Sequence, residues 1–144
     1  MKKMLLMNGP NLNMLGVREP DVYGRRTLAS IAADVASYGA QRGVQVDCFQ
    51  SNHEGELVDR LHQAHGVYDG IVYNPGAHTH YSYALRDAVG SIDVPVAEVH
   101  ISDVDAREPF RQVSYAGMAC VKTYKGLGFD GYIEAVRFLE DYLA

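Results

Sequence analysis

The sequence predicts an α/β protein with one doubly wound, flavodoxin-like sheet of five parallel strands and helices on both faces. Two observations lead to this prediction. Five short apolar runs alternate with segments of helical periodicity along the whole chain. Right-handed crossovers between parallel strands place helices on both faces of a sheet. A chain of 144 residues has room for one domain of ordinary size, so we expect a single catalytic domain over residues 1–144.

The first half of the chain contains two predicted strands and two predicted helices. Residues 3–8 and 44–50 are short apolar runs of strand length. Between them, apolar side chains recur at helical spacing up to Gly43, which is a helix stop signal. A second helix is expected over residues 54–65, because Gly66 follows it as another stop signal.

The second half continues the alternation. Apolar runs at residues 68–74, 94–100 and 118–124 are expected to be strands, and residues 81–89 a helix. Asp130 is expected to cap a final helix. The apolar face of that helix carries Tyr132, Val136, Leu139 and Leu143.

A long loop, over about residues 9–26, separates the first strand from the first helix. Connections longer than about 12 to 15 residues are uncommon in compact domains and usually act as lids, binding loops or linkers. This loop is rich in proline, glycine and asparagine but lacks the repetitive Ser/Gly composition of a flexible tether. We therefore expect it to be an active-site lid.

Composition argues against several classes of protein. The apolar content of 47% and charged content of 22% are typical of globular proteins and indicate neither disorder nor a membrane span. The net charge is -5 without a dense Lys/Arg block, which argues against a nucleic-acid partner. The apolar run after Lys3 is too short for a signal peptide, so we expect a cytoplasmic protein. Cys48 and Cys120 are expected to be buried free thiols.

Polar residues end three of the predicted strands. Asn8, Asn74 and His100 each lead into a polar loop, and the carboxyl ends of parallel strands meet at one edge of a sheet. We therefore expect these loops to converge on a ligand site. An anion site there would be built from arginines in the lid or later in the chain. The candidates are Arg18, Arg25, Arg26, Arg107 and Arg111.

Three alternative interpretations carry less weight. Residues 126–131 match GxGxxG, but the chain ends before the strand and acidic residue that a dinucleotide site requires, so we expect a tight turn instead. Scattered histidines and aspartates lack the spacing of a metal site. A small-ligand binding module without turnover remains an alternative, as does a metal-dependent hydrolase, although Asn8 and Asn74 stand where a receiver module would have acidic residues.

Arg18 and Tyr23 share the loop and suggest a catalytic base. A free tyrosine has a pKa near 10, so only about one molecule in a thousand is ionised at pH 7. A neighbouring guanidinium favours the charged form and can lower a pKa by about 1 to 3, which turns the phenol into a usable base. His100, at the end of a strand, is expected to be the complementary proton donor.

At these residues the chain resembles the type II 3-dehydroquinate dehydratases. The resemblance covers nearly the whole chain and is carried by NGPNLNMLGVREPDVYG (residues 8–24), NPGAHTHYSYALRDA (74–88) and EVHISDVDAREPFR (98–111). It implies reversible anti elimination of water from 3-dehydroquinate, through an enolate, to give 3-dehydroshikimate. It also implies that neither a metal, nor a cofactor, nor a Schiff-base lysine takes part.

The resemblance also implies roles for individual residues. Tyr23 would remove the C2 proton, Arg18 would hold and acidify Tyr23, and His100 would protonate the departing C1 hydroxyl. Asn11 would help to place a water against the enolate oxygen. The remaining residues would bind substrate: Asn74, His80 and Arg111 through ring hydroxyls, Ile101 and Ser102 through the carboxylate, and Asp87 from a neighbouring subunit. The family assembles as trimers stacked into dodecamers, so the resemblance implies a homo-dodecamer.

The chain departs from the family pattern just after Ser102. The family commonly has Asn-x-His-Ala-Arg-Glu there, whereas this chain has Asp103 and Asp105 in place of the Asn and the His. Two carboxylates close to an anion site are expected to weaken binding of a carboxylate substrate unless Arg107 or Arg111 neutralises them.

Overall fold

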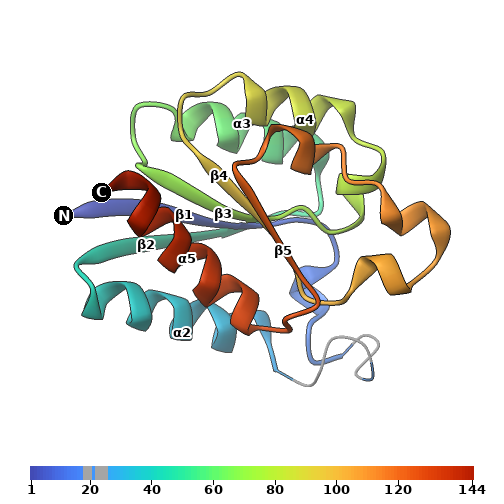
Figure 1. Cartoon of the computed structure of the whole chain (residues 1–144), viewed down its shortest axis with the longest axis horizontal. Coiled ribbons are helices and arrows are strands. Elements are labelled where there is room, and N and C mark those ends of the chain that lie inside the picture. Colours follow the sequence, from blue (N-terminus) through green and yellow to red (C-terminus); the bar gives the residue numbers. More distant parts are fainter. Residues whose placement is uncertain (18–20, 22–25) are drawn as a thin grey trace.

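A single parallel sheet forms the centre of the molecule. The structure is a computed structural model that describes residues 1–17, 21 and 26–144. The strand order is β2-β1-β3-β4-β5 and all neighbouring pairs are parallel, which confirms the predicted five-stranded doubly wound sheet (Figure 1). The strands are β1 (Lys2–Asn8), β2 (Val44–Gln50), β3 (Gly70–Asn74), β4 (Val96–His100) and β5 (Lys122–Lys125).

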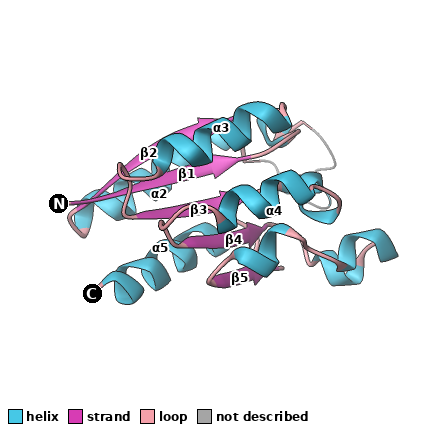
Figure 2. Cartoon of the chain, turned by 90° about the horizontal axis from the view of Figure 1, so that it is seen from above, coloured by secondary structure: helices cyan, strands magenta, loops and turns pink. Residues whose placement is uncertain are grey.

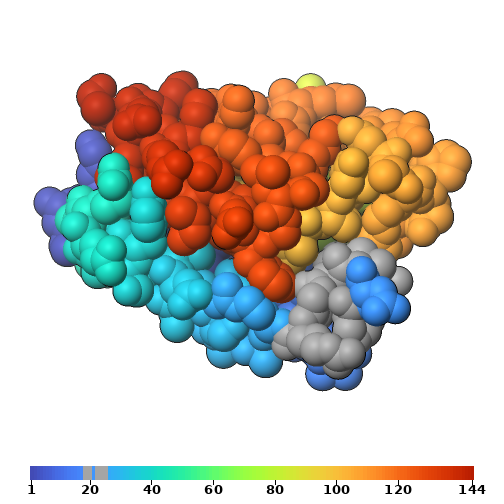
Figure 3. All heavy atoms as spheres, turned by 60° about the horizontal axis from the view of Figure 1, so that its bottom comes forward, coloured from blue at the N-terminus to red at the C-terminus, as the bar shows by residue number. Residues whose placement is uncertain are grey.

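Helices cover both faces of the sheet, as predicted (Figure 2). One face carries α2 (Leu28–Gln41) and α5 (Asp130–Leu143), and the other carries α3 (Glu54–Ala64) and α4 (Tyr83–Gly90). Helices α2 and α5 lie side by side on the surface of their face, in cyan and red in Figure 3. The site described below therefore rests on a rigid three-layer scaffold.

Two apolar cores hold these layers together, because successive side chains of a strand point to opposite faces. In β1, Met4 and Leu6 pack against α2 and α5, whereas Leu5 and Met7 pack against α3 and α4. All four side chains are fully buried. A strand buried on both faces is continuously apolar, which is why β1 has the sequence of a central strand.

Helix starts follow local capping chemistry, with one correction. The hydroxyl of Thr27 accepts a hydrogen bond from the backbone N–H of Ser30, and Ser82 does the same for Leu85. The prediction that Asp130 caps the last helix is wrong, because Phe129 occupies the cap position and Asp130 is the first helical residue. In this position its carboxylate still interacts favourably with the positive end of the helix dipole.

Three predicted strands begin too early in the sequence. Residues 94–95 lie outside β4, which begins at Val96. Tyr68 lies outside β3 because its backbone N–H donates to the carbonyl of Ala64 and so belongs to the end of α3. Residues 118–121 lie outside β5 because Ala116–Ala119 forms a 3₁₀ helix that ends with the bond from Cys120 N–H to the Gly117 carbonyl.

The long loop and the cysteines also differ in part from expectation. The sequence predicted a loop over about residues 9–26. Its first part instead contains a 3₁₀ helix, Leu12–Met14. The thiol of Cys48 is exposed because β2 is an edge strand, and Cys120 is half-buried, so the expectation of two buried thiols is wrong for Cys48. In the part of the chain that the structure describes, no helix is long and apolar enough to cross a membrane.

Candidate active site

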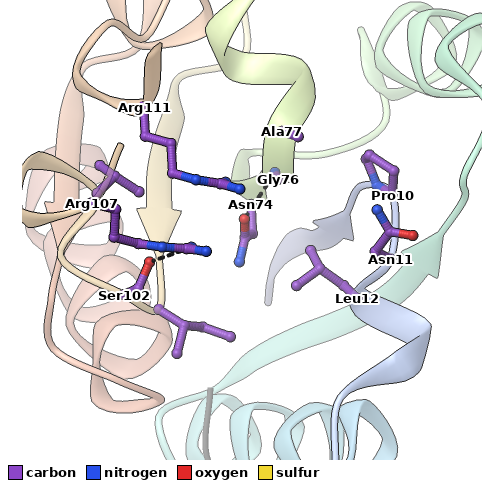
Figure 4. A pocket seen from close by; sticks show the side chains of 11 residues that line it. Pro10, Asn11, Leu12, Asn74, Gly76, Ala77, Ser102, Arg107 and Arg111 are labelled. Atoms are coloured by element: carbon purple, nitrogen blue, oxygen red, sulfur yellow. Dashed lines mark hydrogen bonds between the residues drawn. The ribbon is translucent and has the colours of Figure 1, made fainter. Parts of the chain in front are cut away.

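A cavity of about 130 Å³ lies where β1, β3 and β4 end (Figure 4). Residues 10–12 line it after β1, and Asn74 and residues 76–77 line it after β3. The segment after β4 contributes the largest share. It supplies Ile101, Ser102, Val104, Arg107 and Arg111. The predicted convergence of three polar loops at one sheet edge is therefore confirmed.

The backbone after β1 passes very close to the backbone after β3. Gly9 N–H donates to the Asn74 carbonyl over 2.8 Å, and a Cβ at Gly9 would stand 2.4 Å from the Pro75 oxygen. Only glycine fits such an approach. Asn11 then adopts φ 69°, the left-handed region that asparagine tolerates better than most residues, and its N–H donates to the side-chain oxygen of Asn52. These contacts fix the backbone of Asn11 at the rim of the cavity.

The side chain of Asn74 is buried and oriented at the end of β3. Its Oδ1 accepts the Gly76 N–H over 3.0 Å, and its Nδ2 donates to the hydroxyl of Tyr132 over 2.9 Å. The amide orientation follows from these two partners, because a flipped amide would place an NH₂ group against the Gly76 N–H.

The loop after β4 is tied to the turn at residues 126–128. Gly128 N–H donates to the Ile101 carbonyl and Gly126 N–H to the Ser102 carbonyl, each over 3.0 Å. Both glycines have positive φ, so the GxGxxG match is a tight turn, as expected. This turn fixes the peptide planes of Ile101 and Ser102 beside the cavity.

Two arginines bring positive charge to the cavity. The guanidinium groups of Arg107 and Arg111 both point into it (Figure 4). Arg107 Nη1 donates to Ser102 Oγ over 3.2 Å, and Arg111 Nε forms an ion pair with Glu108. The pair of guanidinium groups is suited to a small anionic ligand.

His100 and Glu98 form a buried acid–base pair next to this cavity. His100 Nε2 lies 2.7 Å from Glu98 Oε2, and both side chains are almost completely shielded from solvent. Three hydroxyl groups also donate to the Glu98 carboxylate. They belong to Thr79, Ser114 and Thr123.

The hydroxyl groups and the imidazole keep Glu98 ionised. Burial by itself raises the pKa of this carboxyl group, but the hydrogen bonds from His100, Ser114 and Thr123 outweigh that effect and hold the pKa at about 2. The carboxylate therefore accepts the Nε2 proton of His100, which leaves Nδ1 as the nitrogen that can face a reacting group.

His80 lies beside His100, with the two rings stacked at 6.2 Å between centroids. Its Nδ1 donates to the Val113 carbonyl over 2.7 Å, so Nε2 is the ring nitrogen that points away from Val113. Burial lowers the pKa of His80, and the nearby charges of His100 and Arg111 lower it further. A neutral His80 at pH 7 is suited to hydrogen bonding with a ligand hydroxyl.

The structure brings most of the predicted site residues together. Five of them line the cavity: Asn11, Asn74, Ile101, Ser102 and Arg111. His80 and His100 lie beside it rather than in its lining. Asp87 is exposed on α4, where it pairs with Arg86, and does not line the cavity of its own chain. Arg18 and Tyr23 lie outside the described residues.

The two aspartates after Ser102 have their own partners. Asp105 forms an ion pair with Lys125 over 2.5 Å, and Asp103 Oδ1 accepts the N–H of Asp105. Lys125, a partner that the sequence analysis did not consider, places a positive charge beside Asp105.

Glu98 was missed because it lies within an apolar strand and resembles a core position. The available signal was its spacing: two residues before His100 on the same strand places both side chains on one face of the sheet. Thr79, Ser114 and Thr123 come from three separate segments, so only the fold brings them together. Over residues 1–17, 21 and 26–144, no cluster of three or more His, Cys, Asp or Glu side chains is placed to hold a metal ion.

Comparisons with known proteins agree with this geometry. The family model described as "Dehydroquinase class II" matches residues 2–140. The chain belongs to the class II dehydroquinase family. It is 56% identical over 143 residues to a 3-dehydroquinate dehydratase of Bacillus mycoides (strain KBAB4), covering 99% of this chain and 98% of that protein.

Solved structures show the same fold. The type II dehydroquinase from Butyrivibrio crossotus DSM 2876 is 44% identical with a TM-score of 0.95, covering 96% of this chain and 97% of that one. The type II dehydroquinase from Propionibacterium acnes is 39% identical, also with a TM-score of 0.95, covering 98% and 97%. The doubly wound fold of this dehydroquinase is therefore that of its family.

Proposed function

We propose that this dehydroquinase catalyses the reversible dehydration of 3-dehydroquinate to 3-dehydroshikimate. The observation that carries the proposal is the His100–Glu98 pair next to a cavity lined by two arginines and the oriented amide of Asn74. Such a site combines a proton donor with groups that bind a carboxylate and hydroxyls. The names of its relatives agree with this reaction.

The proposed chemistry is an anti elimination through an enolate. Tyr23, held and acidified by Arg18, removes the C2 proton, and the electron pair moves to the C3 carbonyl oxygen. Asn11 places a water that stabilises the enolate oxygen. Collapse of the enolate forms the C1–C2 double bond and breaks the bond to the C1 hydroxyl, which takes a proton from His100 and leaves as water.

The geometry of His100 supports its role as the acid. Its Nε2–H donates to the buried Glu98 carboxylate, which orients the ring, and the proton to be delivered is carried on Nδ1. In the reverse reaction the same nitrogen accepts a proton from water. Glu98 touches neither substrate nor reacting atoms in this scheme; it orients His100.

Substrate binding is assigned to the rest of the cavity. We place the carboxylate at the backbone amides of Ile101 and Ser102 and at the Ser102 hydroxyl, next to the two carbonyl groups that the turn at residues 126–128 holds. Asn74, His80 and Arg111 hold ring hydroxyls. The guanidinium of Arg107, bonded to Ser102 Oγ, adds positive charge near the carboxylate.

We also propose that the protein works in the cytoplasm as a homo-dodecamer of stacked trimers, without a cofactor or a metal. The exposed position of Asp87 on α4 supports a role in the site of a neighbouring subunit. Its carboxylate, paired with Arg86, is exposed enough to contact another chain. The free thiols of Cys48 and Cys120 agree with a reducing compartment.

A product assay tests the function directly. Purified protein is incubated with 3-dehydroquinate, and the conjugated enone of the product is followed by its ultraviolet absorbance. We expect an absorbance rise that is unchanged after treatment with a chelator, whereas a metal-dependent hydrolase would lose activity. Binding of 3-dehydroquinate without any absorbance rise would favour the binding-module alternative and end the proposal.

A further inference from the structure

The hydroxyl of Tyr132 connects two asparagines at the ends of neighbouring strands. It donates to Asn8 Oδ1 over 2.6 Å and accepts from Asn74 Nδ2 over 2.9 Å. Asn8 and Asn74 stand opposite each other in the β1–β3 register. The hydroxyl therefore bridges the ends of β1 and β3, at the edge of the sheet where the cavity lies.

The bridge is almost completely shielded from solvent. Tyr132 has an exposed fraction of 0%, Asn8 of 1% and Asn74 of 2%, so water does not compete for these hydrogen bonds. Burial raises the pKa of Tyr132, so its hydroxyl keeps its proton at neutral pH. The ring of Tyr132 packs in the apolar core under α5. Packing of the ring does not require the hydroxyl, which hydrogen-bonds to the two asparagines.

Two hydrogen bonds orient the side-chain amide of Asn74, and one of them is made with the Tyr132 hydroxyl. Its Oδ1 is fixed by the Gly76 N–H, and its Nδ2 is fixed by Tyr132. An amide NH₂ has two N–H donors, so the bond to Tyr132 leaves a second one for a ligand in the cavity that Asn74 lines. Without the hydroxyl, the NH₂ group loses the partner that sets its direction.

We infer that Tyr132 is a positioning residue, which orients the Asn74 amide to receive a ring hydroxyl of the substrate. The inference rests on the proposed function, because that function assigns the hydroxyl to Asn74. Tyr132 itself does not line the cavity and takes no part in bond breaking. Its loss should therefore weaken substrate binding rather than slow the chemical step.

The test compares Tyr132→Phe with Tyr73→Phe in steady-state assays on 3-dehydroquinate. Tyr73, in β3, is a matched control, since its side chain is as fully buried as that of Tyr132 but its hydroxyl has no hydrogen-bond partner among the described residues. We expect Tyr132→Phe to raise KM about 3- to 10-fold, the effect of one lost hydrogen bond, with kcat within about 2-fold of wild type. We expect Tyr73→Phe to leave both constants unchanged.

A purely structural role would give a different result. Partial unfolding of Tyr132→Phe would lower the active fraction, and so kcat, while KM stayed at the wild-type value. An unchanged KM in a folded Tyr132→Phe protein would overturn the inference. If wild type itself fails to convert 3-dehydroquinate, the proposed function fails instead, so the two failures can be told apart.

A second variant covers the case in which Tyr132→Phe does not fold. Asn8→Ala removes the acceptor that holds the Tyr132 hydroxyl, and Asn8 itself does not line the cavity. Any rise in KM from this variant must be transmitted through the bridge or the adjoining loop. We expect a rise of about 2- to 5-fold, and a wild-type KM in Asn8→Ala would likewise overturn the inference.

Discussion

The carboxylate of Glu98 lies 2.7 Å from Nε2 of His100, two residues further along the same buried strand. Strand geometry produces this contact, because alternate side chains point to one face. Thr123 stands opposite Glu98 in the β4–β5 register and donates a hydrogen bond to the second carboxylate oxygen. A Cβ at Gly117 would lie 2.4 Å from that oxygen, so the backbone also closes over the carboxylate.

Substitution of Glu98→Gln should slow the reaction more than it weakens binding. A general acid contributes about 100- to 10,000-fold to a rate, and loss of the charged hydrogen-bond acceptor that orients His100 should forfeit about 10- to 100-fold of kcat. We expect KM to change less than about 3-fold. Steady-state kinetics on 3-dehydroquinate measures both constants, and Glu134→Gln, which alters a surface pair with Arg137, is the control. Wild-type kcat in Glu98→Gln would contradict the proposed role of His100.

The low pKa of Glu98 predicts a loss of stability in acid. Its ordinary value of 4.5 falls to about 2 in the folded protein, so folding favours the ionised form. The stabilisation is present above pH 4.5 and is lost as the pH falls toward 2. Between pH 6 and pH 3 it should decline by about 2 kcal/mol. Denaturant unfolding of wild type and Glu98→Gln at fixed protein concentration checks this, and equal slopes against pH would contradict it.

The sheet, and the edge of it at which the cavity lies, could be predicted because both follow from local sequence patterns. Apolar runs that alternate with helical periodicity identify βα units, and the parallel arrangement alone brings the residues after Asn8, Asn74 and His100 together. Neither step requires knowledge of distant contacts. Prediction therefore succeeded for the elements and for the position of the cavity.

The features that were missed depend on contacts between distant segments. Glu98 looks like part of an apolar strand until Thr79, Ser114 and Thr123 are seen to surround it. The exposure of Cys48 depends on which strand lies at the edge of the sheet, and strand order is not encoded in the strand's own residues. Such properties become visible only once the chain is folded.

The ion pair between Asp105 and Lys125 predicts that Asp105 does little harm to substrate binding. Its charge is balanced by a lysine 2.5 Å away. Substitution of Asp105→Asn should therefore change KM by less than about 2-fold, since a half-exposed pair contributes little energy. A KM lowered 5-fold or more would show that this carboxylate does repel the substrate.

Arg111→Ala, which removes a cavity guanidinium, should raise KM about 10-fold or more in the same assay.

Substitution of Tyr23→Phe should abolish turnover while the protein stays folded. Tyr23 lies outside the described residues, and its proposed role as the base rests on the family resemblance and on the chemistry of a phenol beside Arg18. We expect kcat to fall at least about 100-fold, because phenylalanine cannot accept the C2 proton. Thermal unfolding should occur at the wild-type temperature. Tyr142→Phe, at an exposed position on α5, should keep full activity, and comparable turnover in Tyr23→Phe would assign the base to another residue.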